Sequence, residues 1–174
     1  MIKIMISKIL IYLRLIKQLM SEFIIYTDGS CNTEYKLGAW AAIILFDSEE
    51  LVLQGIETDT THNRMELLSV IRSFEYIIKN KLLDKSIRVF TDSQYVAGIE
   101  GRTENFKLSD FKTKSGKDIQ NIDLVKKLIK QIEMLKPKFI KVKAHQKKTS
   151  ERNINREVDK LSRKLVRDYL KKAK

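Results

Sequence analysis

The chain has 174 residues, with 34 lysines and arginines against 22 aspartates and glutamates, and its formal net charge is +12. This length suits one domain with a hydrophobic core, and 43% hydrophobic with 32% charged residues excludes an intrinsically disordered chain. A single cysteine, Cys31, excludes an internal disulfide, points to a reducing compartment such as the cytoplasm, and argues against a structural zinc cluster. The excess positive charge favours a polyanionic partner, either a nucleic acid or an acidic membrane surface.

The first nineteen residues are mostly apolar, yet they carry four cations and no acidic residue. Lys8 and Arg14 would each cost about 2.5–3.5 kcal/mol inside a bilayer, which argues against a membrane span. An amphipathic surface helix, a weak targeting segment and translated upstream sequence all remain open, and Met20 could serve as a start. We favour the last interpretation, and expect residues 1–19 to be a basic apolar extension and residues 20–174 to form a single domain.

Strand-like and helical patterns alternate along the rest of the chain. In chain order they predict strands 23–27, 39–46 and 51–54, helix 63–79, strand 87–91, a short helix over 93–99 capped by Ser93, helix 122–135, strand 139–142 and helix 154–172. Residues 100–120 are polar without periodicity and form a predicted insertion. The order βββαβα-insertion-αβα predicts an α/β domain with a five-stranded mixed sheet flanked by helices.

Four acidic residues lie at the ends of predicted strands or near the starts of predicted helices. Asp28 closes the first strand before the turn signal Gly29-Ser30, and Asp92 closes the fourth strand. If these strands are parallel neighbours, both acids lie at the edge of the sheet where ligands bind. Glu66 is predicted in the first turn of its helix and Asp159 early in the last helix.

These carboxylates predict a site for divalent cations. Four converging acids would repel one another unless a cation is bound, and oxygen ligands suit Mg²⁺ or Mn²⁺. Two such ions are a recurring device for phosphodiester hydrolysis. Any one of the acids could instead simply cap a turn or a helix, so the prediction depends on the four together.

Five segments, in order and spacing, resemble type 1 ribonuclease H. They are Tyr-Thr-Asp-Gly-Ser-Cys at 26–31, Asn-Arg-Met-Glu-Leu at 63–67, Thr-Asp-Ser-Gln-Tyr-Val at 91–96, Ala-His at 144–145 and Asn-Arg-Glu-Val-Asp at 155–159. The resemblance implies the ribonuclease H-like fold and an endonuclease that cuts the RNA strand of RNA–DNA hybrids by a two-metal-ion mechanism. The ends would be 5′-phosphate and 3′-hydroxyl.

The resemblance also implies roles for individual residues. Asp28, Glu66, Asp92 and Asp159 would hold two Mg²⁺ ions, for which Mn²⁺ can substitute. His145 would assist proton transfer or product departure, although a histidine in a lysine-rich loop is as readily an exposed loop residue.

Further residues would bind the substrate. The positions that match those reading the 2′-hydroxyls of the RNA strand are Ser30, Cys31, Asn63 and Gln94. Cys31 could equally be a small packing residue, and Asn63 a helix N-cap. The insertion occupies the place of the family's basic protrusion but lacks its tryptophans, so we expect phosphate contacts more than stacking, or only a solvated loop. Its candidate phosphate-binding residues are Lys112, Lys114 and Lys117.

Two other functions are compatible with the resemblance. One is a catalytically silent nucleic-acid-binding module, which the presence of all four acids disfavours. The other is the ribonuclease H part of a reverse-transcriptase system, which the chain length disfavours. We therefore expect a free-standing monomeric enzyme in the cytoplasm, with no membrane partner.

Overall fold

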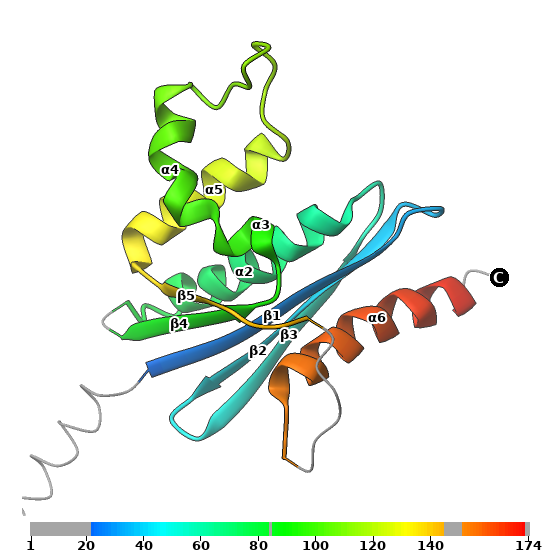
Figure 1. Ribbon diagram of the computed structural model, residues 1–174. Helices are drawn as coiled ribbons and strands as arrows, with labels where there is room; N and C mark the ends of the chain where they lie inside the picture. The colour runs from blue at the N-terminus through cyan, green and yellow to red at the C-terminus, as the bar shows by residue number, and fades with distance from the viewer. Residues whose placement is uncertain (1–21, 84, 145–150, 173–174) are drawn as a thin grey trace, which may run out of the picture.

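The computed structural model describes residues 22–83, 85–144 and 151–172. The predicted extension 1–19 and His145 lie outside the described residues. Five strands form one sheet in the order β3-β2-β1-β4-β5 (Figure 1). They are β1 (Glu22–Asn32), β2 (Leu37–Phe46), β3 (Glu49–Glu57), β4 (Ser86–Thr91) and β5 (Lys138–Lys141). The first three pair antiparallel, whereas β1–β4 and β4–β5 are parallel, which confirms the predicted mixed sheet.

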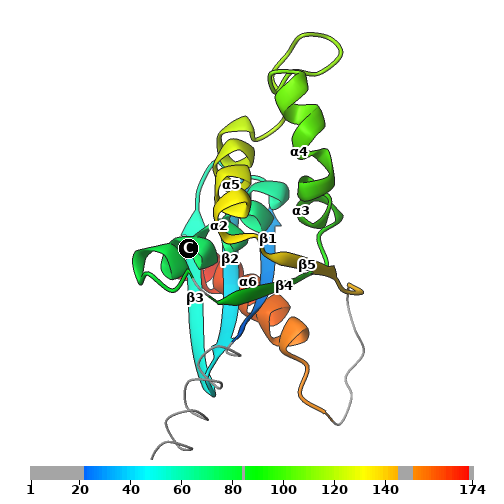
Figure 2. The same cartoon turned by 90° about the vertical axis from the view of Figure 1, so that its left-hand side faces the viewer.

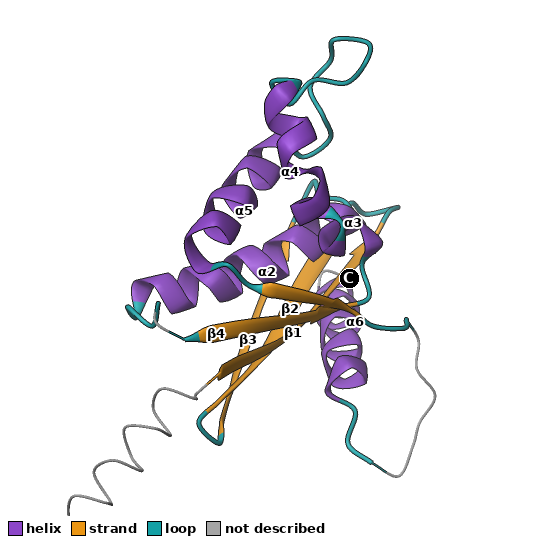
Figure 3. Cartoon of the chain, turned by 60° about the vertical axis from the view of Figure 1, so that its left-hand side comes forward, coloured by secondary structure: helices purple, strands orange, loops and turns teal. Residues whose placement is uncertain are grey.

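The helices cover both faces of this sheet. They are α2 (His62–Lys79), α3 (Gln94–Ala97), α4 (Ile99–Leu108), α5 (Ile122–Leu135) and α6 (Ile154–Lys172). The main apolar core lies between the sheet, α2 and α5, and smaller clusters lie under α6 on the other face (Figure 3). The periodic apolar positions of α2, α5 and α6 form these cores, so the three long helices confirm the sequence prediction.

The prediction that the first strand ends at Asp28 is wrong. β1 continues to Asn32, because β2 supplies ladder partners for Asp28, Gly29 and the residues that follow. Backbone pairing therefore overrides the local turn preference of an Asp-Gly-Ser sequence.

The start of α2 also differs from the prediction. The helix begins at His62, and its N-cap is Thr61, whose side-chain oxygen accepts from the Arg64 amide at 3.4 Å. Asn63 is consequently not the cap, and Glu66 lies in the second helical turn instead of the first.

The predicted insertion contains a helix that its sequence did not reveal. Residues 99–108 form α4, which projects from the sheet with the following loop; we call residues 99–120 the protrusion (Figures 1 and 2). Ile99 is the buried residue of this helix, so α4 has no apolar stripe from which periodicity could be read. Arg102 anchors the helix instead, because its guanidinium lies 5.1 Å from the Tyr95 ring centroid and 5.4 Å from that of Phe106.

Candidate active site

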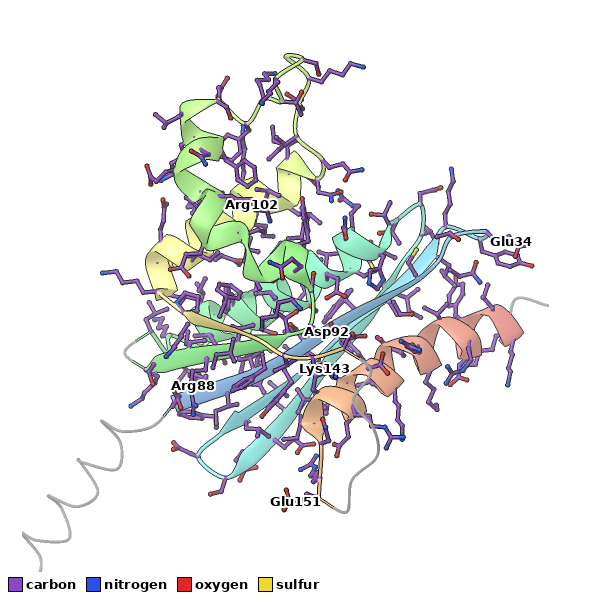
Figure 4. The ribbon with its side chains drawn as sticks, viewed as in Figure 1. Glu34, Arg88, Asp92, Arg102, Lys143 and Glu151 are labelled. Atoms are coloured by element: carbon purple, nitrogen blue, oxygen red, sulfur yellow. The ribbon has the colours of Figure 1, made fainter. Side chains whose placement is uncertain are left out.

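A cleft of about 680 Å³ opens beside the carboxyl ends of the two central parallel strands. Its walls come from β1, the first turns of α2, the segment after β4, Ala144 and α6. The register pairs Thr27 with Thr91, so Asp28 and Asp92 each stand one residue beyond the same pair. Figure 4 shows Asp92 where β4 ends, near the middle of the sheet. This confirms the predicted parallel pairing and brings both acids to one edge.

Glu66 joins these two acids because α2 approaches β1 very closely. A Cβ atom at Gly29 would lie 2.5 Å from the Glu66 backbone nitrogen, so only glycine permits this approach. Carboxylate oxygens of Asp28, Glu66 and Asp92 consequently lie within 4.8 Å of one another. Asp28 is 6% exposed and Glu66 is 2% exposed, so two of the three acids are buried.

The environment of these acids opposes their ionisation. Burial, followed by the charge of Glu66, raises the pKa of Asp28 to about 8, although a hydrogen bond from Ser162 acts in the opposite direction. Burial also raises the pKa of Glu66, while a hydrogen bond from His62 opposes this rise. His62 Nε2 lies 3.2 Å from Glu66 Oε1, and this contact raises the pKa of His62. Without a cation, Asp28 therefore keeps its proton at neutral pH, because the chain supplies too little positive charge to neutralise the fully ionised cluster.

A divalent cation fits this arrangement. Glu66 Oε2 is buried and has no hydrogen-bond partner among the described residues. An unpartnered carboxylate oxygen is costly in a protein interior unless a cation accepts its lone pairs. Three clustered oxygen donors without a cysteine among them suit Mg²⁺ or Mn²⁺ better than zinc.

The fourth predicted acid lies in the same cleft but apart from this cluster. Asp159 projects from α6, and its Oδ1 is 2.8 Å from Arg163 Nε one turn later. Its charge still raises the pKa of Asp28. The sequence predicts that all four acids converge, whereas the structure groups three of them and pairs the fourth with an arginine.

The sequence prediction missed Ser162, a fully buried residue of α6. Its hydroxyl donates to Asp28 Oδ2 and also lies 3.0 Å from the carbonyl oxygen of Asp159. The signal was available in the sequence, because Ser162 sits midway between Val158 and Val166 on the apolar side of the helix. A small polar residue at such a position needs a buried partner.

The predicted substrate-binding residues fall into two groups. Four of them line the cleft: Ser30, Cys31, Asn63 and Gln94. Cys31 is half-buried, its thiol donates to the Thr60 carbonyl at 3.6 Å, and burial raises its pKa. The three lysines are exposed on the protrusion, away from the cleft lining, where Lys112 pairs with Asp118 at 2.6 Å.

The aromatic side chains of the protrusion contact one another and nearby cations. Phe106 and Phe111 stack with their ring centroids 6.3 Å apart, and the Lys126 ammonium lies 4.7 Å from the Phe111 centroid. These contacts shape the protrusion itself. Within the described part of the chain, no helix combines the length and the apolar character that crossing a membrane requires.

Comparison with known proteins adds independent information. Residues 20–167 match the model of the RNase H family. A ribonuclease H of Wolbachia pipientis wMel is 37% identical over 84% of this chain and 97% of its own length. A ribonuclease H of Caldicellulosiruptor saccharolyticus is 30% identical over 86% of this chain and 99% of its own length.

Solved structures share the fold at lower identity. A type 1 RNase H with the type 2 active-site motif superposes with a TM-score of 0.69 and 22% identity, over 84% of this chain and 72% of that one. A foamy viral protease-reverse transcriptase in complex with dsDNA gives a TM-score of 0.63 and 14% identity, over 84% of this chain and 93% of the viral chain. At these sequence identities, the two similarities establish a shared fold and nothing more.

Proposed function

The chain belongs to the ribonuclease H family, and from this premise we propose that it is an endonuclease hydrolysing the RNA strand of RNA–DNA hybrids. The observation that carries the proposal is the cluster of Asp28, Glu66 and Asp92, whose oxygens lie within 4.8 Å of one another beside an open cleft. A silent binding module would bear the electrostatic cost of this cluster without using it.

We further propose that Asp28, Glu66 and Asp92 hold Mg²⁺, for which Mn²⁺ can substitute, and that Asp159 completes the set of ligands. Asp159 would then exchange its bond to Arg163 for a bond to a cation. When bound, two such ions supply an activated water and stabilise the leaving oxygen, which yields 5′-phosphate and 3′-hydroxyl ends.

The chain's own residues prepare these ligands. Ser162 donates to Asp28 and so favours the ionised form of that carboxylate. His62 does the same for Glu66 from the exposed side of α2. Gly29 leaves room for both acids to approach each other. Together these contacts hold the carboxylates in position before substrate arrives.

We propose that the polar residues of the cleft recognise the RNA strand. A 2′-hydroxyl both donates and accepts hydrogen bonds, and so do the side-chain amides of Asn63 and Gln94. Ser30 and Cys31 offer smaller groups beside them. We assign Lys112, Lys114 and Lys117 to phosphate contacts and His145 to proton transfer or product departure, and propose a cytoplasmic monomer.

The test uses the purified full chain with three end-labelled substrates: an RNA–DNA hybrid, duplex DNA and duplex RNA. Cleavage is expected only in the RNA strand of the hybrid, only with Mg²⁺ or Mn²⁺, and should stop when EDTA is added. Phosphatase treatment of the products reports whether the new 5′ ends carry phosphate. Equal cleavage of duplex RNA, or no cleavage of the hybrid in either metal, would overturn the proposal.

A further inference from the structure

The last helix presents a row of cations along one side. Residues Arg156, Lys160, Arg163, Arg167 and Lys171 follow one another at intervals of three or four positions, which places them on a single side of α6. We call this row the basic stripe. At 1.5 Å per residue it extends for about 22 Å.

The other sides of α6 are occupied in different ways. Val158, Ser162 and Val166 are buried against the sheet. The acids Glu157 and Asp168 lie on a flank, where Arg152 and Lys164 pair with them. Asp159, the third acid of the helix, pairs with Arg163 of the stripe, so the positive charge of the stripe comes mainly from its other four cations.

Four members of the stripe keep their charges available. Among the described residues, Arg156, Lys160, Arg167 and Lys171 have no carboxylate within ion-pair distance, and all but Arg156 are exposed. A solvated ammonium or guanidinium in this state attracts polyanions at little desolvation cost.

The stripe is continuous with the cleft. Arg163 lies within the stripe and lines the cleft together with Asp159, while Arg156 precedes and Lys160 follows that acid along the helix. In Figure 1 α6 runs away from the end of β4 on the sheet face opposite α2 and α5, so its outer side is not covered by those helices. A strand that enters the cleft can consequently continue along the stripe.

We propose that the basic stripe binds the phosphate backbone of an RNA–DNA hybrid where the duplex extends beyond the cleft. This inference rests on the proposed function and adds a second contact to it. The whole stripe, including Arg163 of the cleft, is about 22 Å long and corresponds to roughly six nucleotides of one strand at about 3.4 Å each. The contact is electrostatic and independent of sequence, so it discriminates by the length of the hybrid.

The test compares two triple variants. The first is Lys160→Gln with Arg167→Gln and Lys171→Gln, which leaves Arg163 of the cleft intact. The control is Lys79→Gln with Lys130→Gln and Lys138→Gln, which removes three exposed lysines from α2, α5 and β5. Glutamine keeps helix propensity nearly constant, and circular dichroism verifies the fold.

Binding is measured by fluorescence anisotropy in EDTA, with hybrids of about 8 and about 24 base pairs, from low to high salt. The stripe variant should bind the long hybrid at least about tenfold more weakly, with a salt slope lower by about 2 to 3. Its affinity for the short hybrid should fall less than its affinity for the long one, and the control variant should follow the wild type throughout.

Two outcomes would overturn the proposal. One is an equal loss in both triple variants, or an unchanged salt slope in the stripe variant. The other is loss of binding to phosphatidylserine vesicles with unchanged binding to the long hybrid, which would assign the stripe to a membrane surface. Failure of the proposed function is separately visible, because the wild type would then cut neither hybrid in Mg²⁺.

Discussion

The carboxylate cluster and the protrusion are both rich in polar residues, but different forces hold them. Backbone pairing of β1 with β4 and the contact of α2 at Gly29 fix the cluster, and two of its three acids are buried. Exposed ion pairs and stacked side chains shape the protrusion. The cluster is therefore rigid and intolerant of change, whereas the protrusion should tolerate substitution and respond to salt.

The largest effect is expected when one charge of the cluster is removed. Asp92→Asn keeps the size of the side chain but removes a proposed cation ligand, and hydrolysis of the hybrid should fall by at least about 10³-fold. Binding of the hybrid, measured by anisotropy in EDTA, should change little. Asp110→Asn in the protrusion is the matched control, and retained activity in Asp92→Asn would refute the cluster as the catalytic centre.

Substitution of one glycine in each region should show how tightly the cluster and the protrusion are packed. Gly29→Ala forces a Cβ to 2.5 Å from the Glu66 nitrogen, so the free energy of unfolding should fall by about 3 kcal/mol or more. Among the described residues beyond its own stretch of helix, no heavy atom lies within 4 Å of a Cβ added at Gly101 in α4, and Gly101→Ala should stabilise by about 0.5–1 kcal/mol. Urea denaturation measures both, and equal effects would contradict the contrast between a packed site and an open helix.

A smaller difference between the cluster and the protrusion is expected in the pH dependence of the free energy of unfolding. Without a cation the pKa of Asp28 rises from 3.8 to about 8, so between these values the folded chain keeps a proton that the unfolded chain releases. The free energy of unfolding should therefore fall as pH rises through this range, by at most about 1.4 kcal/mol per pH unit from this group.

Urea denaturation in EDTA from pH 4 to 9 measures this fall. Asp28→Asn should flatten the curve, because the titrating group is gone. Asp118→Asn in the protrusion should leave the slope near that of the wild type, since the pKa of Asp118 is lowered by Lys112. A wild-type curve that rises across this range would refute the assignment.

A smaller effect is expected when the support of the cluster is removed. Ser162→Ala deletes the donor to Asp28 without adding volume, and binding of Mn²⁺ followed by electron paramagnetic resonance should weaken about five- to tenfold. Ser73→Ala is the control, because Ser73 is equally buried and, within the described part of the chain, its hydroxyl donates to the Ser69 carbonyl alone, at 2.8 Å. Identical titrations of the two variants would show that Ser162 acts through packing alone.

The smallest effect is expected in the protrusion. Lys112→Ala breaks an exposed pair with Asp118, and such pairs contribute about 0–1 kcal/mol. The melting temperature should change little, whereas hybrid binding should weaken a few fold at low salt and recover its wild-type value at high salt. A large loss of stability would place this lysine in the structural framework.

The sequence was informative where a polar residue ended a hydrophobic run. Asp28 and Asp92 follow such runs, and the parallel pairing of their strands was predictable from the alternation of strands and helices. Hydrophobic periodicity also predicted the five strands and the three long helices. It did not predict α4, because Ile99 alone is buried in that helix, which Arg102 holds through its contacts with aromatic rings.

Other details depend on contacts between distant segments. Ser162 lies 134 residues from Asp28 along the chain, so no local pattern links them. The Asp159–Arg163 pair is different, since its spacing of four residues on a helix favours an ion pair in any context. For Asp159, the local ion pair with Arg163 therefore competes with a position beside the three acids of the cluster.

The hydroxyl of Ser162 has a consequence of its own, because it carries one hydrogen and faces two acceptors. When Asp28 is protonated, the acid can donate to Ser162, and Ser162 can donate to the Asp159 carbonyl. When Asp28 is ionised, the hydroxyl must turn to it and release that carbonyl. The charge state of Asp28 therefore decides which of the two acceptors receives the single hydrogen of the Ser162 hydroxyl.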